Sequence, residues 1–91
     1  MSRIGQIRSL VRNGLYYLTE HAHDEAVADG FDVSDVENGM ITGKVRRTWP
    51  REGKFEVVGV ALDGRSIGVV CRITQGAKVR VITTYEDQPH K

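Results

Sequence analysis

The sequence predicts an α+β fold in which two to three N-terminal helices pack on one side of a four-stranded antiparallel β-sheet. Apolar residues recur at helical spacing up to position 43, whereas from Lys44 onward they form short runs or alternate with polar residues. Turn sequences of a few residues separate these runs, and such short connections favour antiparallel neighbours. A chain of 91 residues can bury one hydrophobic core, so we expect a single domain over residues 1–91.

The first helix is expected to begin after Ser2, which can cap it, and to end at Asn13-Gly14, where glycine permits a left-handed stop. Tyr16-Tyr17-Leu18 then forms a short extended segment. The apolar positions of this helix are three or four residues apart: Ile4, Ile7, Leu10 and Val11.

The second helix is expected over residues 20–29, with Thr19 as its N-cap and Gly30 at its end. Ser34 and Glu37 then fit the pattern of a capping box, which predicts a short third helix that stops by Gly43. The helical part of the domain is therefore residues 1–43.

The sheet is expected to occupy residues 44–86, followed by a frayed tail at 87–91. Pro50 and the turn residues after it end the first strand, Asp63-Gly64 is the strongest hairpin signal, and Gln75-Gly76 makes the last turn. The four strands are residues 44–49, 55–61, 66–73 and 78–85.

The net charge of +1 hides a strong segregation of charge along the chain. Residues 19–43 carry seven acidic side chains and no Lys or Arg, whereas residues 44–80 carry nine basic side chains and three acidic ones. A basic sheet beside an acidic helical segment could bind a phosphate backbone. Alternatively, the two blocks could pair with each other as surface charge.

Several classes of protein are disfavoured. The single Cys71 cannot form an internal disulfide and is expected to be a reduced, buried thiol. No stretch approaches the ~20 apolar residues of a membrane span, and the N-terminus lacks a signal-peptide core. We therefore expect a cytoplasmic protein with no membrane partner.

Two histidines open the second helix. His21 and His23 are two positions apart, so on a helix they point in different directions and do not suit a shared metal ion. His23 is expected to be packed or hydrogen-bonded. His21 is the better candidate for catalysis because Glu25, one turn later, can orient its imidazole, although a structural role remains open.

Cations and hydroxyls of the sheet complete this candidate site. Arg72 interrupts an apolar strand, so it can serve as an anion clamp or form a salt bridge with a helical acid. Strict alternation in the last strand puts Arg80 on one face and both Thr83 and Tyr85 on the other.

Aromatic and basic residues also cluster at the end of the first strand. Trp49 lies beside Arg46, Arg47 and Arg51, and its indole could stack on an unpaired base or cover the edge of the core. Alternation places Arg46 and Arg47 on opposite faces.

Short motifs over residues 15–86 resemble the domain of unknown function family 4258. The motifs are Tyr17-x-Thr19-x-His21-Ala22, Gly30, Ser34 with Val36, Gly43, Asp63-Gly64-Arg65 and Val81-Ile82-Thr83. That family in turn resembles the barnase–EndoU–colicin–RelE superfamily of small metal-independent RNases, whose members are often toxins neutralised by an antitoxin. The resemblance implies a RelE/barnase-like fold.

The resemblance also implies a toxin-type endoribonuclease that cleaves RNA by transesterification without a metal or cofactor. His21 would be the general acid or base, with Thr83 and Tyr85 positioning the phosphate. Arg46, Arg72 or Arg80 would stabilise the phosphorane. Expected partners are RNA, held by Arg46, Arg47, Trp49 and Arg51, together with an antitoxin and the ribosome.

The chain departs from the family pattern on the second helix. Glu25 and Asp29 stand where the family carries basic residues, and acidic side chains there repel a phosphate backbone. Two alternatives therefore stay open: a non-catalytic RNA- or ribosome-binding module, and a protein-interaction domain of the same fold.

Overall fold

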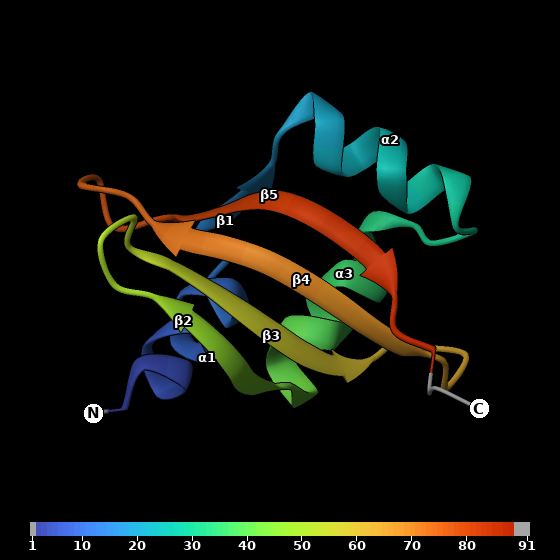
Figure 1. Ribbon diagram of the computed structural model, residues 1–91, viewed down its shortest axis with the longest axis horizontal. Helices are drawn as coiled ribbons and strands as arrows, with labels where there is room; N and C mark the ends of the chain where they lie inside the picture. The colour runs from blue at the N-terminus through green and yellow to red at the C-terminus, as the bar shows by residue number, and fades with distance from the viewer. Residues whose placement is uncertain (1, 89–91) are drawn as a thin grey trace.

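The computed structural model describes residues 2–88, which form an α+β arrangement (Figure 1). Helices α1 and α3 pack on one face of a single sheet, and α2 runs along its upper edge beside β5 (Figure 1). The elements are α1 (Arg3–Arg12), β1 (Tyr16–Leu18), α2 (Glu20–Ala28), α3 (Val33–Thr42), β2 (Lys44–Trp49), β3 (Lys54–Val60), β4 (Ser66–Ile73) and β5 (Val79–Glu86).

The sheet has five strands in the order β1-β5-β4-β3-β2, and β1 pairs with β5 in parallel. The prediction of a four-stranded antiparallel sheet is therefore wrong in this respect, although β2 to β5 do form an antiparallel meander. The sequence Tyr16-Tyr17-Leu18 is too short and too uniformly large and apolar to show an alternating pattern that would identify a strand. Its partner also lies some sixty positions away, so no local pattern indicates the pairing.

The predicted N-caps of the first two helices are confirmed. Ser2 accepts a hydrogen bond from the Gly5 amide, and Thr19 accepts one from the Ala22 amide. The third helix begins earlier than expected, because Asp32 rather than Ser34 is its N-cap. Asp32 and Asp35 form the capping box, which any short acceptor side chain at both positions can make.

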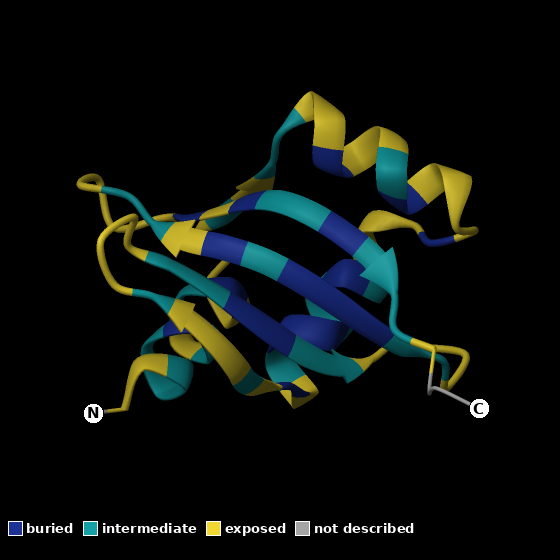
Figure 2. Cartoon of the chain, viewed as in Figure 1, coloured by how far each residue is buried: buried dark blue, intermediate teal, exposed yellow. Residues whose placement is uncertain are grey.

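One hydrophobic core lies between the sheet and the helices (Figure 2). Helix α3 approaches β3 very closely, because a side chain at Gly59 would overlap the Gly39 carbonyl oxygen. Glycine therefore sets the distance between helix and sheet here. The fully buried side chains of the core include Ile7, Val11, Val36, Met40, Val57, Ile67, Val69, Val79 and Val81.

Two β-bulges change which side chains share a face. In β2, Val45 pairs with Val57 and Arg47 pairs with Glu56, so Arg46 is an extra residue. In β5, Val81 pairs with Cys71 and Thr83 pairs with Val70, so Ile82 is extra. Each bulge shifts the alternation by one residue.

The sheet extends further than the sequence indicates. The Asp87 amide, expected in a frayed tail, donates a hydrogen bond to the Ser66 carbonyl at 2.9 Å. Residues 89–91 of that expected tail lie outside the described part of the chain.

Candidate nucleic-acid interface

The sheet face opposite α1 and α3, here called the open face, carries most of the predicted site residues. Because of the bulge at Ile82, Arg80, Thr83 and Tyr85 pair with three same-face residues of β4 and so share the open face. The predicted separation of Arg80 from Thr83 and Tyr85 is therefore wrong. Other basic and aromatic residues of this face are Lys44, Arg46, Arg47, Trp49, Lys54 and Arg72.

Arg46 is held in an ion-pair cluster rather than left available. Its Nη2 donates to Glu56 Oε1 at 3.0 Å and to the Tyr85 hydroxyl, while its Nη1 donates to Asp87 at 3.0 Å. The Tyr85 hydroxyl in turn donates to Glu56 at 2.9 Å. The charge of Arg46 is thus neutralised by two carboxylates, and Tyr85 is fixed in place.

Burial and hydrogen bonding control the titration of this cluster. Glu56 is 5% exposed. Burial raises the pKa of its carboxyl, but hydrogen bonds from Arg46 and Tyr85 outweigh burial and hold the pKa below its ordinary value. Burial, together with the bond to Glu56, raises the pKa of Tyr85 to about 12. The sequence analysis did not identify Glu56 as part of this cluster. The signal was present, because Glu56 is the only charged residue in the apolar strand 55–61 and a buried acid needs a partner.

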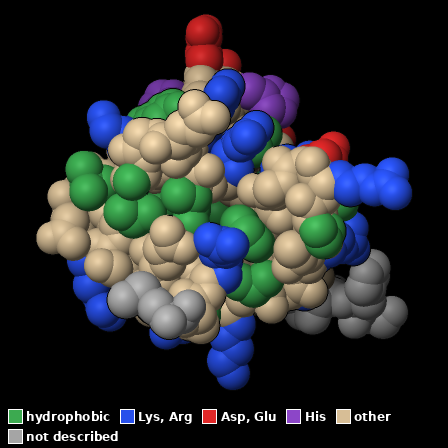
Figure 3. All heavy atoms as spheres, turned by 90° about the vertical axis from the view of Figure 1, so that its left-hand side faces the viewer, with side chains coloured by type: hydrophobic (Ala, Val, Ile, Leu, Met, Phe, Trp, Pro, Cys, Tyr) green, Lys and Arg blue, Asp and Glu red, His purple; other side chains and the backbone are tan. Residues whose placement is uncertain are grey.

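Of the remaining cations of the open face, Lys54 lies 3.6 Å from the Glu52 carboxylate, and within residues 2–88 the others have no such partner. Among residues 2–88, no salt bridge involves Lys44, Arg47, Arg72 or Arg80. Lys and Arg side chains are spread over the end of the molecule that carries the β2–β3 and β4–β5 turns (Figure 3). This part of the surface is therefore electropositive.

Trp49 lies half-buried at the end of β2 between two cations. The Arg47 guanidinium is 5.4 Å from the indole centroid, and the Lys54 ammonium is 5.2 Å from it. Trp49 and Arg51 also line a shallow groove of about 590 Å³ over the β2–β3 turn. The structure thus brings Arg47 and Trp49 together at one end of the open face, with Arg51 in the adjoining β2–β3 turn.

His21 lies at the other side, where α2 meets the edge of β5. Its imidazole is 72% exposed, and its Nε2 lies 3.3 Å from Glu25 Oε1. The same oxygen accepts a hydrogen bond from the Thr84 amide at 3.3 Å. Glu25 therefore orients His21 next to the C-terminal half of β5, which carries Thr83.

His23 is more exposed than the sequence indicates. It is 57% exposed, with Asp24 3.9 Å away, so the expectation of a packed residue is wrong. It lines an open groove of about 750 Å³ whose other sides are formed by β1 and the start of α3. His23 is exposed because the buried side of α2 consists only of Ala22 and Ala26, and His23 lies outside it.

Glu25 and Asp29, the two acidic residues of α2 and its C-cap where the resemblance implies basic ones, have a structural role. Glu25 accepts from the Thr84 amide, and Asp29 accepts from the Glu86 amide at 2.9 Å. These amides belong to the stretch of β5 beyond its pairing with β1. The carboxylates therefore satisfy an otherwise unpaired sheet edge.

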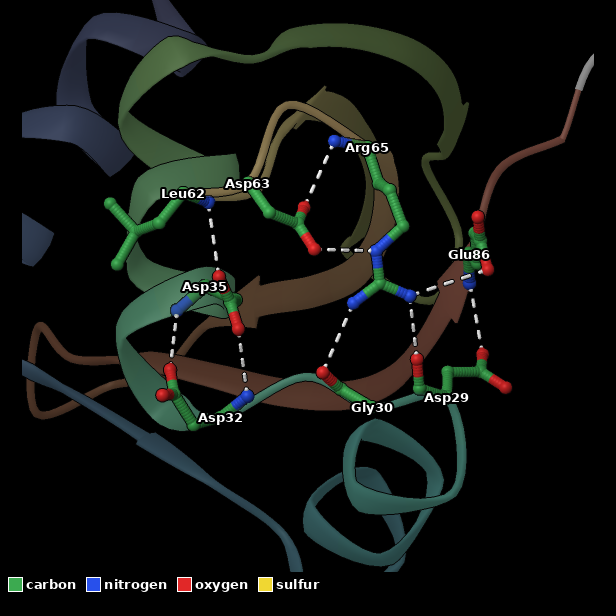
Figure 4. Close-up of polar contacts among 8 residues, drawn as sticks. All are labelled: Asp29, Gly30, Asp32, Asp35, Leu62, Asp63, Arg65 and Glu86. Carbon is green, nitrogen blue, oxygen red and sulfur yellow. Dashed lines mark hydrogen bonds and ion pairs between the residues drawn. The ribbon is translucent and has the colours of Figure 1, made fainter.

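Arg65 joins the β3–β4 turn to the C-terminal end of α2 (Figure 4). Its guanidinium donates to the carbonyls of Asp29 at 2.8 Å and Gly30 at 3.0 Å and to the Asp63 carboxylate at 2.8 Å. It also lies 4.2 Å from the centre of the Phe31 ring. The Asp63-Gly64-Arg65 motif is therefore a clamp that holds α2 in position.

The described residues form neither a metal-binding cluster nor a membrane-spanning helix. Within residues 2–88 there is no group of three or more His, Cys, Asp or Glu side chains arranged to hold a metal ion. No helix in this range is long and apolar enough to cross a membrane.

The fold and the open face define a small α+β domain with an electropositive sheet surface and an exposed histidine at its edge. Residues 18–86 match the model of DUF4258, a domain of unknown function, so the chain belongs to that family. No curated protein and no solved structure matches the chain.

Proposed function

We propose that the protein binds RNA through the open face of its sheet. The observation that carries the proposal is that, among residues 2–88, no salt bridge joins the acidic segment 19–43 to the basic segment 44–80. The acids on the helices therefore do not neutralise the cations of the sheet. An electropositive surface of this kind attracts a polyanion.

The placement of two arginines strengthens this argument. Arg72 and Arg80 are direct partners across β4 and β5, and like charges in that relationship destabilise a sheet. Lys and Arg commonly protect sheet edges from aggregation, but β4 is the central strand. A bound anion would offset the repulsion.

The test is the salt dependence of RNA binding. We expect Arg72→Ala combined with Arg80→Ala to weaken binding of a fluorescein-labelled RNA oligonucleotide, measured by anisotropy. The slope of log K against log salt should fall by roughly 0.7 per lost phosphate contact. Arg12→Ala is the matched control, because Arg12 is exposed on α1 behind the sheet. No binding by the wild type at low salt, or equal binding by both variants, would overturn the proposal.

A second candidate function is metal-independent cleavage of that RNA, as a toxin-type endoribonuclease. The observation that favours it is the exposed His21 imidazole oriented by Glu25, since a positioned carboxylate behind an exposed base is the arrangement of a general acid–base residue. Thr83, on the open face of the neighbouring strand, would contact the phosphate, and Arg72 or Arg80 would stabilise its charge. An antitoxin and the ribosome belong to this candidate as partners.

The two candidates separate in one experiment. Induced expression of the wild type should arrest growth and degrade RNA if the protein is a nuclease, and His21→Ala should abolish both effects with an unchanged melting temperature. His23→Ala is the matched control, because His23 is a similarly exposed histidine on the same helix. If the wild type binds RNA but does not cleave it, the nuclease candidate is rejected and the non-catalytic RNA- or ribosome-binding module is retained.

A further inference from the structure

Five side chains lie in one register across all five strands of the open face. Tyr17 of β1 is the partner of Arg80 on β5, and Arg80 is the partner of Arg72 on β4. Arg72 is in turn opposite Lys54 on β3, and Lys54 is opposite Trp49 on β2. We call these five residues the cross-strand row. It has an aromatic residue at each end and three cations between them.

The row is partly exposed and has a defined length. Lys54 and Trp49 are half-buried, and the Lys54 ammonium lies 3.6 Å from the Glu52 carboxylate and 5.2 Å from the centre of the Trp49 ring. Tyr17 is 43% exposed, and both arginines are exposed, whereas Tyr16 and Leu18, the neighbours of Tyr17, pack against the core. Neighbouring strands are about 4.8 Å apart, so four steps across the sheet span roughly 19 Å. That length accommodates a few nucleotides of an extended single strand.

The order of chemical groups in the row matches an unpaired nucleic acid. Unpaired bases stack on aromatic side chains, and the phosphates between them contact cations. A duplex already has its bases stacked on one another, so it could use the three cations but not the two aromatic side chains.

We propose that the cross-strand row is the track of a single-stranded RNA that crosses the strands at right angles. One base stacks on Tyr17 and another on Trp49, and the intervening phosphates contact Arg80, Arg72 and Lys54. This inference rests on the proposed RNA-binding function and adds to it the class of substrate and the direction of the bound strand.

The test compares aromatic and cationic variants on single-stranded RNA and on the same sequence as a duplex. Trp49→Leu and Tyr17→Leu should each weaken single-strand binding about tenfold, as expected for the loss of one stacked base. They should leave the salt slope and the weaker duplex binding unchanged. Phe55→Leu is the control, because Phe55 packs against the core and pairs in register with Thr48 rather than with a row residue.

The outcomes distinguish this inference from the function on which it rests. If the wild type binds both forms of RNA equally, or if the aromatic variants bind as the wild type does, the track is wrong while RNA binding stands. If the wild type binds no RNA, the proposed function itself is wrong. Circular dichroism and melting temperatures of each variant verify that the sheet is intact.

Discussion

The ring of Tyr85 on β5 lies directly over Gly68 on β4, its partner in the register. A Cβ atom at Gly68 would overlap the Cζ and hydroxyl of Tyr85. The absence of a side chain at Gly68 therefore lets the phenol lie across the sheet and reach Glu56 on β3.

Replacement of Gly68 by Ala should displace Tyr85 and break its bond to Glu56. We expect Gly68→Ala to lower the free energy of unfolding by about 1–3 kcal/mol, the usual cost of overpacking a fitted site. Urea unfolding measures this cost. In a Tyr85→Ala background the same substitution should cost much less, because the overlapping ring is gone. An equal cost in both backgrounds would contradict the assigned contact.

The carboxylate of Glu56 should make stability depend on pH in acid. Its pKa in the folded state lies below the ordinary 4.5, so ionised Glu56 stabilises the fold above that pH. This contribution is lost as the pH falls through the folded-state pKa. Glu56→Gln should cost about 1–3 kcal/mol at pH 7, because the Arg46 and Tyr85 bonds to a charged acceptor are weakened.

The pH profile separates Glu56 from other carboxylates. The difference in stability between wild type and Glu56→Gln should shrink as the pH falls below the ordinary 4.5 and through the lowered pKa of the folded state. Glu52→Gln is the control, since Glu52 is 57% exposed in the β2–β3 turn and should have little effect at any pH. A difference that stays constant across the acid range would show that Glu56 acts through shape alone.

The planar guanidinium of Arg65, and not only its positive charge, should be required for stability. Arg65→Lys keeps the charge but has only one nitrogen, so it cannot reproduce the planar group whose Nε, Nη1 and Nη2 reach Asp63, Asp29 and Gly30 separately, nor stack as a plane on Phe31. We expect a lower melting temperature and faster amide exchange at the C-terminal end of α2. Arg12→Lys on α1 should change neither measurement, and equal behaviour of the two variants would argue against the clamp.

Cys71 should be unreactive in the folded protein. Its side chain is fully buried, and burial raises the pKa of the thiol to about 12, so very little thiolate exists at pH 8. We expect a thiol reagent to alkylate Cys71 only as fast as the protein unfolds, and we expect urea to accelerate this reaction. Gln75→Cys places a thiol in the exposed β4–β5 turn and should react at once. Fast labelling of wild-type Cys71 without urea would contradict its burial.

Local chemistry was sufficient to predict much of the fold. Ser2 and Thr19 act on amides three residues away, and Asp63-Gly64 forms a turn whose geometry depends on its own backbone, with a positive φ of 89° at Gly64. Such signals are contained within a few positions of sequence, so the starts of the first two helices and the β3–β4 hairpin could be predicted from the sequence.

The candidate site was less predictable, because two bulges decide it. Alternation assigns faces correctly only while pairing is regular, and one extra residue at Arg46 or Ile82 reverses every assignment after it. The sequence pattern predicted Arg80, Thr83 and Tyr85 as site residues but placed Arg80 on the opposite face from the other two. The partners of Arg46 could not be identified either, because Glu56 and Asp87 are distant in sequence.

By itself, the sequence determined the α+β class, the N-caps of the first two helices, the hairpins and the separation of acidic from basic segments, since each of these depends on residues close together in the chain. Only the tertiary structure decided that β1 joins the sheet beside β5, that Glu25 and Asp29 cover the exposed edge of β5, and that three cations and two aromatic residues fall in one row. These relationships depend on strand register and bulges, and register is set by packing between residues far apart in the sequence.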